Sequence, residues 1–428
     1  MFTINKQTAW AKGGWKPDIL RKSVTDFASK HHITHRKVQS HQIQGQNIYY
    51  NEMKPIFIAL RLIGRFPYSF TKTGFAPFSL MSWPFLYCLI FNVIFCVMTA
   101  WSIQKMIRDK IYPSQSYDET LFWCLLVWFA LQSFLGPITF WWDAPRTVSY
   151  FKKWKDFEDS WRCGAMYSVK RLRFTMIFSA SIIPVAIIII VYETLTLPKI
   201  SIFVFLPYIP ILVADVLMLV HWWLTLYELT LYSEQLLISL FKVTDRREIG
   251  YRRRIWLKIT HLVSETGNAL GASGLSYTST FFVGFILSIY GILINLAMPG
   301  SSNVSVWGLL FPAGYSCISK YLAADAAYRA TEQIGPSFTK KLLQINLSTL
   351  QRNCLNEIDL LVNCLSAKSP VIEYLGFLKI TRQTFLQFVS SAVTYLIVFV
   401  QMKNHPKELD PYPRQEGDNN LTSYDNLS

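Results

Sequence analysis

Leu121-Phe-Trp-Cys-Leu-Leu-Val-Trp-Phe-Ala130 is a run of ten consecutive apolar residues. It belongs to a longer apolar stretch, 120–142, and a helix that spans a bilayer needs about 20 mostly apolar residues. Outward from this run, six more stretches meet the same requirement: 78–104, 174–195, 202–233, 270–298, 305–325 and 380–402. The sequence therefore predicts an all-α membrane protein with seven transmembrane helices. The stretch 202–233 is overlong, so its last turns are expected to project into water.

The composition argues against a nucleic-acid partner. Only 16% of the 428 residues are charged, whereas about 25% is usual in soluble domains. The net charge of +15 is basic, but the Lys and Arg residues lie in blocks between the apolar stretches, as in membrane proteins. The seven cysteines form no CxxC pair, and we expect free thiols.

The distribution of Lys and Arg predicts the orientation in the membrane. Loops on the cytoplasmic side carry an excess of these residues. The segments 1–77, 143–173, 236–269 and 326–376 carry 32 of them, whereas 105–119, 196–201, 299–304 and 403–428 carry seven. We therefore expect a cytoplasmic N-terminus and an extracellular C-terminus, the reverse of a G-protein-coupled receptor.

The chain divides into five regions under this topology. They are a cytoplasmic arm at 1–77 with an interfacial helix at 54–66, six helices at 78–335, a cytoplasmic region at 336–379 with amphipathic helices at 338–365, the seventh helix at 380–402 and an extracellular tail at 403–428. Gly267, Gly271 and Gly274 form a small-residue face, which predicts close packing between helices.

No motif in the sequence predicts an enzyme, a cofactor or a metal site. His31, His32 and His35 have helical spacing, but they lie in the polar N-terminal arm, where a solvated run is favoured over metal ligands. The chain contains no Gly-rich phosphate loop, no HExxH and no nucleophile elbow.

The last predicted helix carries a polar stripe. Its members are spaced by three or four residues, so they share one helix face: Gln387, Ser391, Thr394, Val398 and Gln401. Polar groups in hydrocarbon need partners or water. The stripe either hydrogen-bonds neighbouring helices of the same chain or lines a water-filled pore formed by several copies. Periodicity alone does not separate these alternatives. An uncharged stripe with an apolar step at Val398 suits a poorly discriminating cation path.

Thr394-Tyr-Leu-Ile-Val-Phe-Val-Gln401 resembles the C-terminal signature of insect gustatory receptors, which is Thr-Tyr, five hydrophobic residues and Gln. This resemblance implies a ligand-gated non-selective cation channel, a homo- or heterotetramer in the plasma membrane of a sensory neuron dendrite. Gln401 and Val398 would then face the pore, while Thr394 and Tyr395 would brace the helix. The cytoplasmic ends of helices four to seven, including 336–379, would form the anchor between subunits.

The ligand implied by the resemblance is a small molecule, either a taste compound or carbon dioxide. Leu396 stands where sugar-type receptors usually carry Glu, so a sweet receptor is disfavoured. Gly267-Asn-Ala-Leu, Leu287-Ser-Ile-Tyr-Gly and Ala326-Ala-Tyr are similar to the carbon-dioxide branch, although that branch tends to have an acid and a His around the third stretch. The bitter-type branch is a further alternative.

The resemblance places the ligand pocket in the outer half of the first six helices. Ionisable groups inside a membrane are functional candidates, and aromatic side chains commonly line pockets. The candidates are Trp123, Trp128, Glu193, Tyr208, Asp215 and Tyr290. Each has a simpler explanation: a structural hydrogen bond for Asp215, headgroup contact for Glu193 and an interfacial aromatic belt for the others. His221, beside two tryptophans, is expected to be structural.

Two other classes of function compete with the channel. A metabotropic seven-helix receptor would need an extracellular N-terminus, which the charge distribution opposes. A secondary transporter would need broken helices and paired intramembrane charges, and only Pro184 and Asp215 are consistent with these features.

Overall fold

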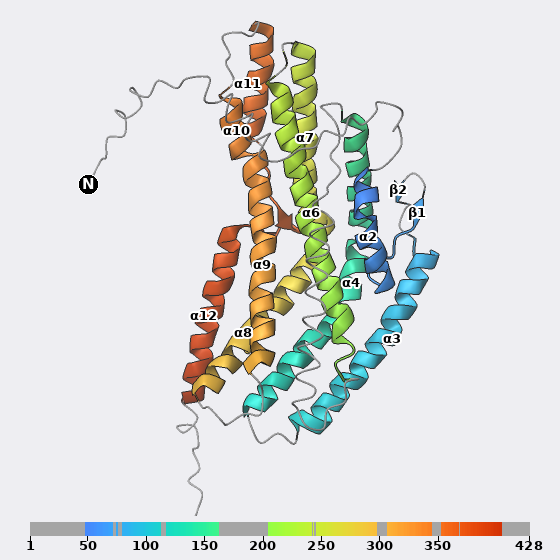
Figure 1. Ribbon diagram of the computed structural model, residues 1–428, viewed down its shortest axis with the longest axis vertical. Coiled ribbons are helices and arrows are strands. Elements are labelled where there is room, and N and C mark those ends of the chain that lie inside the picture. Colours follow the sequence, from blue (N-terminus) through green and yellow to red (C-terminus); the bar gives the residue numbers. More distant parts are fainter. Residues whose placement is uncertain are drawn as a thin grey trace, which may run out of the picture. The chain divides into compact units, whose positions relative to one another are not determined.

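The computed structural model describes residues 48–71, 74–75, 79–112, 117–161, 204–241, 243, 245–297, 306–344, 352–367 and 369–404. All of them lie in one compact unit, Gly45–Ser428. Its helices are α2 (Ile48–Leu62), α3 (Trp83–Met106) with the π-helical turn η1 (Ile107–Ile111), α4 (Tyr117–Ser160), α6 (Tyr208–Leu240), α7 (Arg246–Ala269), α8 (Gly271–Ala297), α9 (Val306–Ile334), α10 (Pro336–Leu342), α11 (Arg352–Ala367) and α12 (Arg382–Asn404) (Figure 1). Two antiparallel hairpins complete the described part, β1 (Phe70–Thr71) with β2 (Gly74–Phe75) and β3 (Glu373–Tyr374) with β4 (Leu378–Lys379).

Five described helices are long and apolar enough to cross a membrane: Trp83–Ile111, Thr120–Ser160, Tyr208–Leu240, Gly271–Leu296 and Arg382–Gln401. They coincide with five predicted spans, and the all-α membrane class is confirmed. The predicted span 305–325 forms the first part of α9, which carries Lys320 and Asp325 and is less apolar. The predicted span 174–195 lies outside the described residues. The inside and outside assignment stays a prediction.

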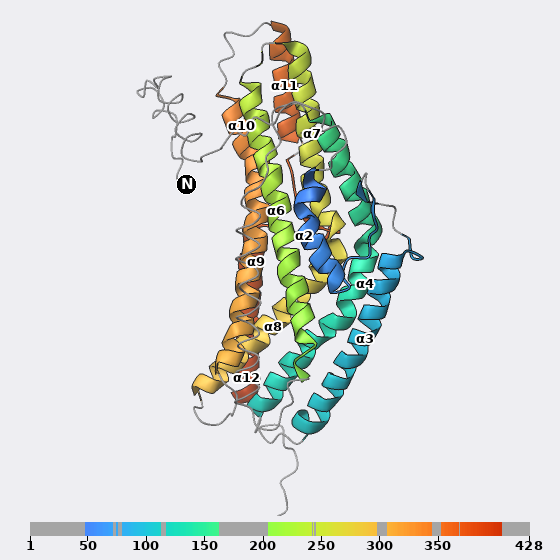
Figure 2. The same ribbon diagram turned by 45° about the vertical axis from the view of Figure 1, so that its right-hand side comes forward.

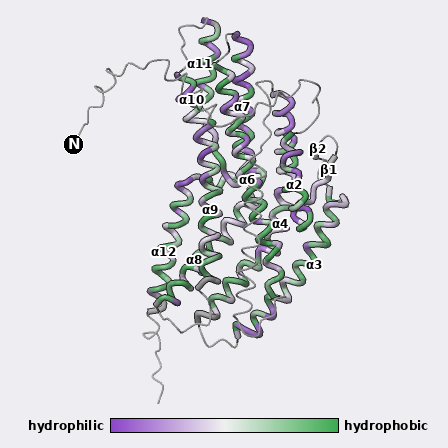
Figure 3. The backbone as a smooth tube through the Cα atoms, viewed as in Figure 1, coloured by the Kyte–Doolittle hydropathy of each residue, from purple (hydrophilic) through white to green (hydrophobic). Residues whose placement is uncertain are grey.

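Several helices continue beyond their predicted spans, and their ends pack together. α4 runs to Ser160 and α6 to Leu240, and hydrophilic residues gather toward the ends of α7, α10 and α11 (Figure 3). Trp154 of α4, Trp256 of α7 and Phe338 of α10 are completely buried in one apolar cluster. The extension of the fourth predicted helix is therefore covered by protein.

The predicted interfacial helix exists, but it begins earlier than expected and one face is buried by protein. α2 starts at Ile48, and Met53, Ile56 and Phe57 have no exposed surface. They pack against α4 and α6. The Phe57 and Phe151 rings, for example, lie 5.3 Å apart.

The region predicted as an anchor between subunits buries part of its apolar face within the chain. Ile358 of α11 packs with Val243 and with Ile249 of α7, and Leu361 is completely buried in the main cluster. Leu360, on another side of α11, is exposed. Positions 345 and 350 of the predicted amphipathic segment lie outside the described residues.

Candidate functional site

The polar stripe of α12 faces away from the rest of the chain. Its five members are all exposed: Gln387, Ser391, Thr394, Val398 and Gln401. The opposite face packs on α8, where Ala392 is completely buried and Leu396 is 9% exposed. Aromatic contacts hold this face, with 5.1 Å between the rings of Phe388 and Phe282. α12 thus lies at the edge of the helix bundle (Figure 1).

The stripe makes no hydrogen bond to another helix in the described part of the chain. The Thr394 hydroxyl donates to the carbonyl of Ser390 on its own helix, at 3.1 Å. Only 11% of the apolar stretch of α12 is buried, against 28–50% in the other four candidate spans. Hydrogen bonds within one chain, the first alternative for the stripe, are therefore not supported. Gln383 lies one turn before Gln387, is exposed and extends the stripe, although the sequence analysis missed it.

The first turn of α12 is tied to α9 by a buried carboxylate. Asp325 is 7% exposed and accepts from Arg382 Nε at 2.8 Å and from Arg382 Nη2 at 2.5 Å. Its other oxygen pairs with Arg329 Nε at 2.6 Å. The Arg382 guanidinium also lies 4.3 Å from the ring centroid of Tyr328, within cation–π range. This cluster could not be predicted from the sequence, because 57 residues separate Asp325 from Arg382.

The glycine face predicted for helix packing receives the β3–β4 hairpin instead. A Cβ on Gly267 would lie 2.4 Å from the carbonyl oxygen of Glu373, and one on Gly271 would lie 2.6 Å from Leu375. The hairpin turns through Leu375 and Gly376, which have φ angles of 53° and 74°, as a tight hairpin turn requires. The chain continues from this hairpin into α12, so the glycine face positions the start of that helix.

Tyr374 fixes the hairpin in the core. Its ring is 5.5 Å from that of Trp222 on α6 and would collide with a Cβ on Gly274. Burial raises the pKa of the Tyr374 hydroxyl above its ordinary value, so the group is neutral. The hairpin is therefore held by close apolar packing on α6, α7 and α8.

Replacing Gly267 with alanine should destabilise the protein. Gly267→Ala would place a methyl group within 2.4 Å of the Glu373 carbonyl, and the backbone cannot yield as a flexible side chain would. We expect the variant to lose about 1–3 kcal/mol of stability, as for other overpacked sites, measured as a lower thermal unfolding midpoint in detergent. Gly314→Ala is the matched control, because nothing lies within 4 Å of its Cβ position. An unchanged midpoint in Gly267→Ala would contradict the packing described here.

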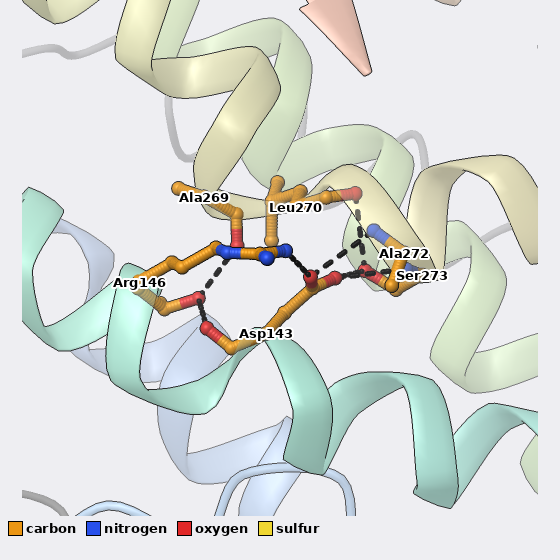
Figure 4. Close-up of polar contacts among 7 residues, drawn as sticks. Asp143, Arg146, Ala269, Leu270, Ala272 and Ser273 are labelled. Carbon is orange, nitrogen blue, oxygen red and sulfur yellow. Dashed lines mark hydrogen bonds and ion pairs between the residues drawn. The ribbon is translucent and has the colours of Figure 1, made fainter. Parts of the chain in front are cut away.

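Asp143 of α4 holds the junction between α7 and α8. Its carboxylate accepts from the backbone N–H groups of Ala272 at 3.0 Å and Ser273 at 2.8 Å, and from the Ser273 hydroxyl at 2.8 Å. Figure 4 shows the carboxylate pointing into the first turn of α8, with Arg146 pairing to it at 3.6 Å. A carboxylate at a helix N-terminus satisfies free N–H groups and favours the helix dipole. Asp143 is thus structural.

Those predicted pocket residues that the structure describes do not meet in one site. Trp123 and Tyr208 share a small cluster between α3, α4 and α6, and the Tyr208 hydroxyl donates to the Leu126 carbonyl at 2.8 Å. The Trp128 indole donates to the Thr280 carbonyl at 3.0 Å. Tyr290 packs on Phe399 of α12, with ring centroids 5.5 Å apart.

The ionisable candidates make structural contacts. Asp215 accepts a hydrogen bond from the Tyr315 hydroxyl of α9. His221 Nε2 lies 3.0 Å from the Tyr49 hydroxyl and borders a cavity of about 10 Å³, enough for one water at most. Glu193 lies outside the described residues. The geometry therefore favours the structural interpretation of Asp215 and His221.

A larger groove of about 460 Å³ lies elsewhere, between α3, η1 and α4. Its lining includes Ile103, Ile107, Tyr112 and Phe134, and none of the predicted pocket residues. Its volume is within the range of small-molecule sites, although it is open.

The sequence is similar to one family of membrane receptors over most of its length. The model of the 7tm chemosensory receptor family matches residues 53–404. The chain belongs to this family. It is 25% identical to gustatory and odorant receptor 24 of Anopheles gambiae over 83% of this chain and 78% of that protein. It is 20% identical to gustatory and odorant receptor 21a of Drosophila melanogaster over 85% and 82% of the two chains.

Solved structures share the fold. The insect olfactory receptor OR5 from Machilis hrabei superposes with a TM-score of 0.57 over 82% of this chain and 98% of that chain, at 13% identity. The same receptor in complex with eugenol gives 0.58 over 83% and 98%, at 14% identity. The family model and the two receptor relatives confirm the predicted membership among insect gustatory receptors. The chain is a multi-pass membrane chemosensory receptor, from a family of receptors and not of enzymes.

Proposed function

We propose that this chemosensory receptor is a ligand-gated non-selective cation channel whose pore is lined by α12 from four copies, identical or related. The ligand is a small molecule, a taste compound or carbon dioxide, and the receptor acts in the plasma membrane of a sensory dendrite. One observation carries the proposal: the polar face of α12 points away from its own chain and makes no hydrogen bond to another described helix.

Lipid is a poor environment for that face. Amide and hydroxyl groups in hydrocarbon are costly unless they meet partners or water. If several copies assembled with their stripes facing one another, the stripes would enclose a water-filled path. The water in that path would hydrate the amide and hydroxyl groups. The stripe carries no charge, which suits passage of monovalent and divalent cations without strong preference. The predicted topology would put Gln401 at the outer mouth.

Thiol accessibility tests the pore directly. Ser391 on the stripe and Val393 beside it are both exposed on the single chain, so the chain alone predicts equal accessibility for cysteines at these positions. A shared pore predicts that a charged, water-soluble thiol reagent blocks ligand-evoked current in Ser391→Cys and leaves Val393→Cys unaffected. The background should lack Cys124, which is exposed. Equal effects on both variants would contradict the pore.

A further inference from the structure

A buried guanidinium lies between α3, α4 and α8 and has no counter-ion among the described residues. Arg65 follows α2, is 2% exposed and makes no ion pair within the described residues. Its Nη1 atom has no hydrogen-bond partner there either. Arginine is not deprotonated in proteins, so this group is a buried positive charge.

Four other cations of the same helix bundle, all more exposed than Arg65, have carboxylate neighbours. Arg382 and Arg329 share Asp325, Arg146 pairs with Asp143, and Lys320 lies in the field of Asp215. A buried charge without a partner is strongly unfavourable, so proteins either pair such groups or use them. Arg65 is the exception that needs an explanation.

Gly136 gives the guanidinium its place. A Cβ on Gly136 would lie 2.3 Å from Arg65 Nη1, so the guanidinium rests on the bare backbone of α4. Gln132 and Phe140 lie one turn before and one turn after Gly136 on the same face of α4. The Arg65 guanidinium carbon is 6.0 Å from the Phe140 ring centroid.

Two further buried polar groups lie at this point. The ring centroids of Phe140 and of Tyr277 on α8 are 6.3 Å apart. The Tyr277 hydroxyl interacts electrostatically with Arg65 and lies beside the Gln132 side chain. The Gln132 Oε1 atom accepts a hydrogen bond from the Thr280 hydroxyl at 3.0 Å, so Gln132 Nε2 points away from Thr280. Gln132 and Tyr277 interact with each other, but neither Gln132 Nε2 nor the Tyr277 hydroxyl makes a hydrogen bond of good geometry to a described residue, and both side chains are at most 5% exposed.

We propose that Arg65, Gln132 and Tyr277 form a binding site for one small monovalent anion, such as chloride or hydrogencarbonate. The free atoms are N–H and O–H donors around one positive charge, which is the complement of an anion. The enclosure of all three side chains limits the ligand to a few atoms. The carboxylates of Asp143 and Asp215 have partners of their own, because Asp143 caps α8 and Asp215 is bonded to Tyr315.

The test measures binding by thermal unfolding of the purified full-length receptor in nanodiscs of uncharged lipid. Chloride and hydrogencarbonate are each titrated against gluconate at constant ionic strength. A ligand that binds the folded state raises the unfolding midpoint in a saturable manner. We expect such a rise in the wild type. No difference between gluconate and either small anion would overturn the proposal.

Three variants locate the site. Gly136→Ala displaces the guanidinium without removing a donor, and Gln132→Met removes one donor at similar volume. Each is expected to raise the apparent Kd at least tenfold, a loss of about 1.4 kcal/mol. Arg65→Met removes the charge and should abolish the anion response. Lys320→Met, at a half-buried cation elsewhere in the bundle, is the control and should respond as the wild type does. A response unchanged in Gly136→Ala and Gln132→Met would show that the anion binds elsewhere and would overturn the site.

Discussion

Asp325→Ala receptors are expected to reach the cell surface and to lose more than about tenfold of their ligand-evoked current, the scale of a typical coupling between sites. The substitution removes the carboxylate that joins the first turn of α12 to α9 and leaves Arg382 without its ion-pair partner. Movements of α9 would then reach the proposed pore helix only through apolar contacts such as that between Tyr321 and Phe385. Whole-cell current normalised to surface expression measures the effect.

Arg329→Ala provides the matched control for this prediction. Arg329 binds the same carboxylate, but it lies on α9 and is largely exposed. Its loss leaves the link to α12 intact, so current should stay within about twofold, as expected for an exposed ion pair. Equal losses in both variants would mean that Asp325 matters for α9 itself and not for its link to α12.

Val398→Ala receptors are expected to conduct without ligand. Val398 is the one apolar member of the stripe and is 44% exposed on the single chain. An apolar ring in a narrow pore excludes water and closes it, and a smaller side chain widens and wets the ring. Holding current in ligand-free solution should rise several-fold at equal surface expression.

Val400→Ala is the control that distinguishes the loss of a gate from a change in the packing of α12. Val400 has nearly the same exposure, 40%, but lies off the stripe. Its truncation should leave the ligand-free current at the wild-type level. Leak in both variants would show that truncation loosens α12 generally, and Val398 would lose its assignment as the constriction.

The sequence predicted those features that depend on one helix at a time. The run from Leu121 to Ala130 is apolar over its whole length, and the spacing from Gln387 to Gln401 places the polar side chains on one face, so both followed from periodicity. The structure added that, within the described residues, this face makes no hydrogen bond to another helix. Spacing within a helix cannot show that, because the neighbours come from elsewhere in the chain.

Features that join distant segments were missed for the same reason. The glycine face that includes Gly267 was predicted to pack against another helix, but a hairpin more than 100 residues later in the chain covers it. Arg65 looked interfacial, because Arg beside apolar residues is common at membrane surfaces, and its burial over Gly136 depends on the path of the chain after α2. The pocket candidates were chosen by residue type, and packing spread them over several interfaces.

The reversal potential of Gln401 charge variants in mixed-ion solutions tests the shared pore most directly. Gln401→Glu would add one carboxylate per copy at the mouth of the pore, which attracts cations and favours divalent ones, while Gln401→Arg would repel them. Phe399→Ala, on the packed face, should alter folding and not ion preference. The account predicts that Gln401→Glu shifts the reversal potential toward that of calcium and that Gln401→Arg suppresses the cation current. Identical reversal potentials in the two Gln401 variants would contradict a pore lined by α12.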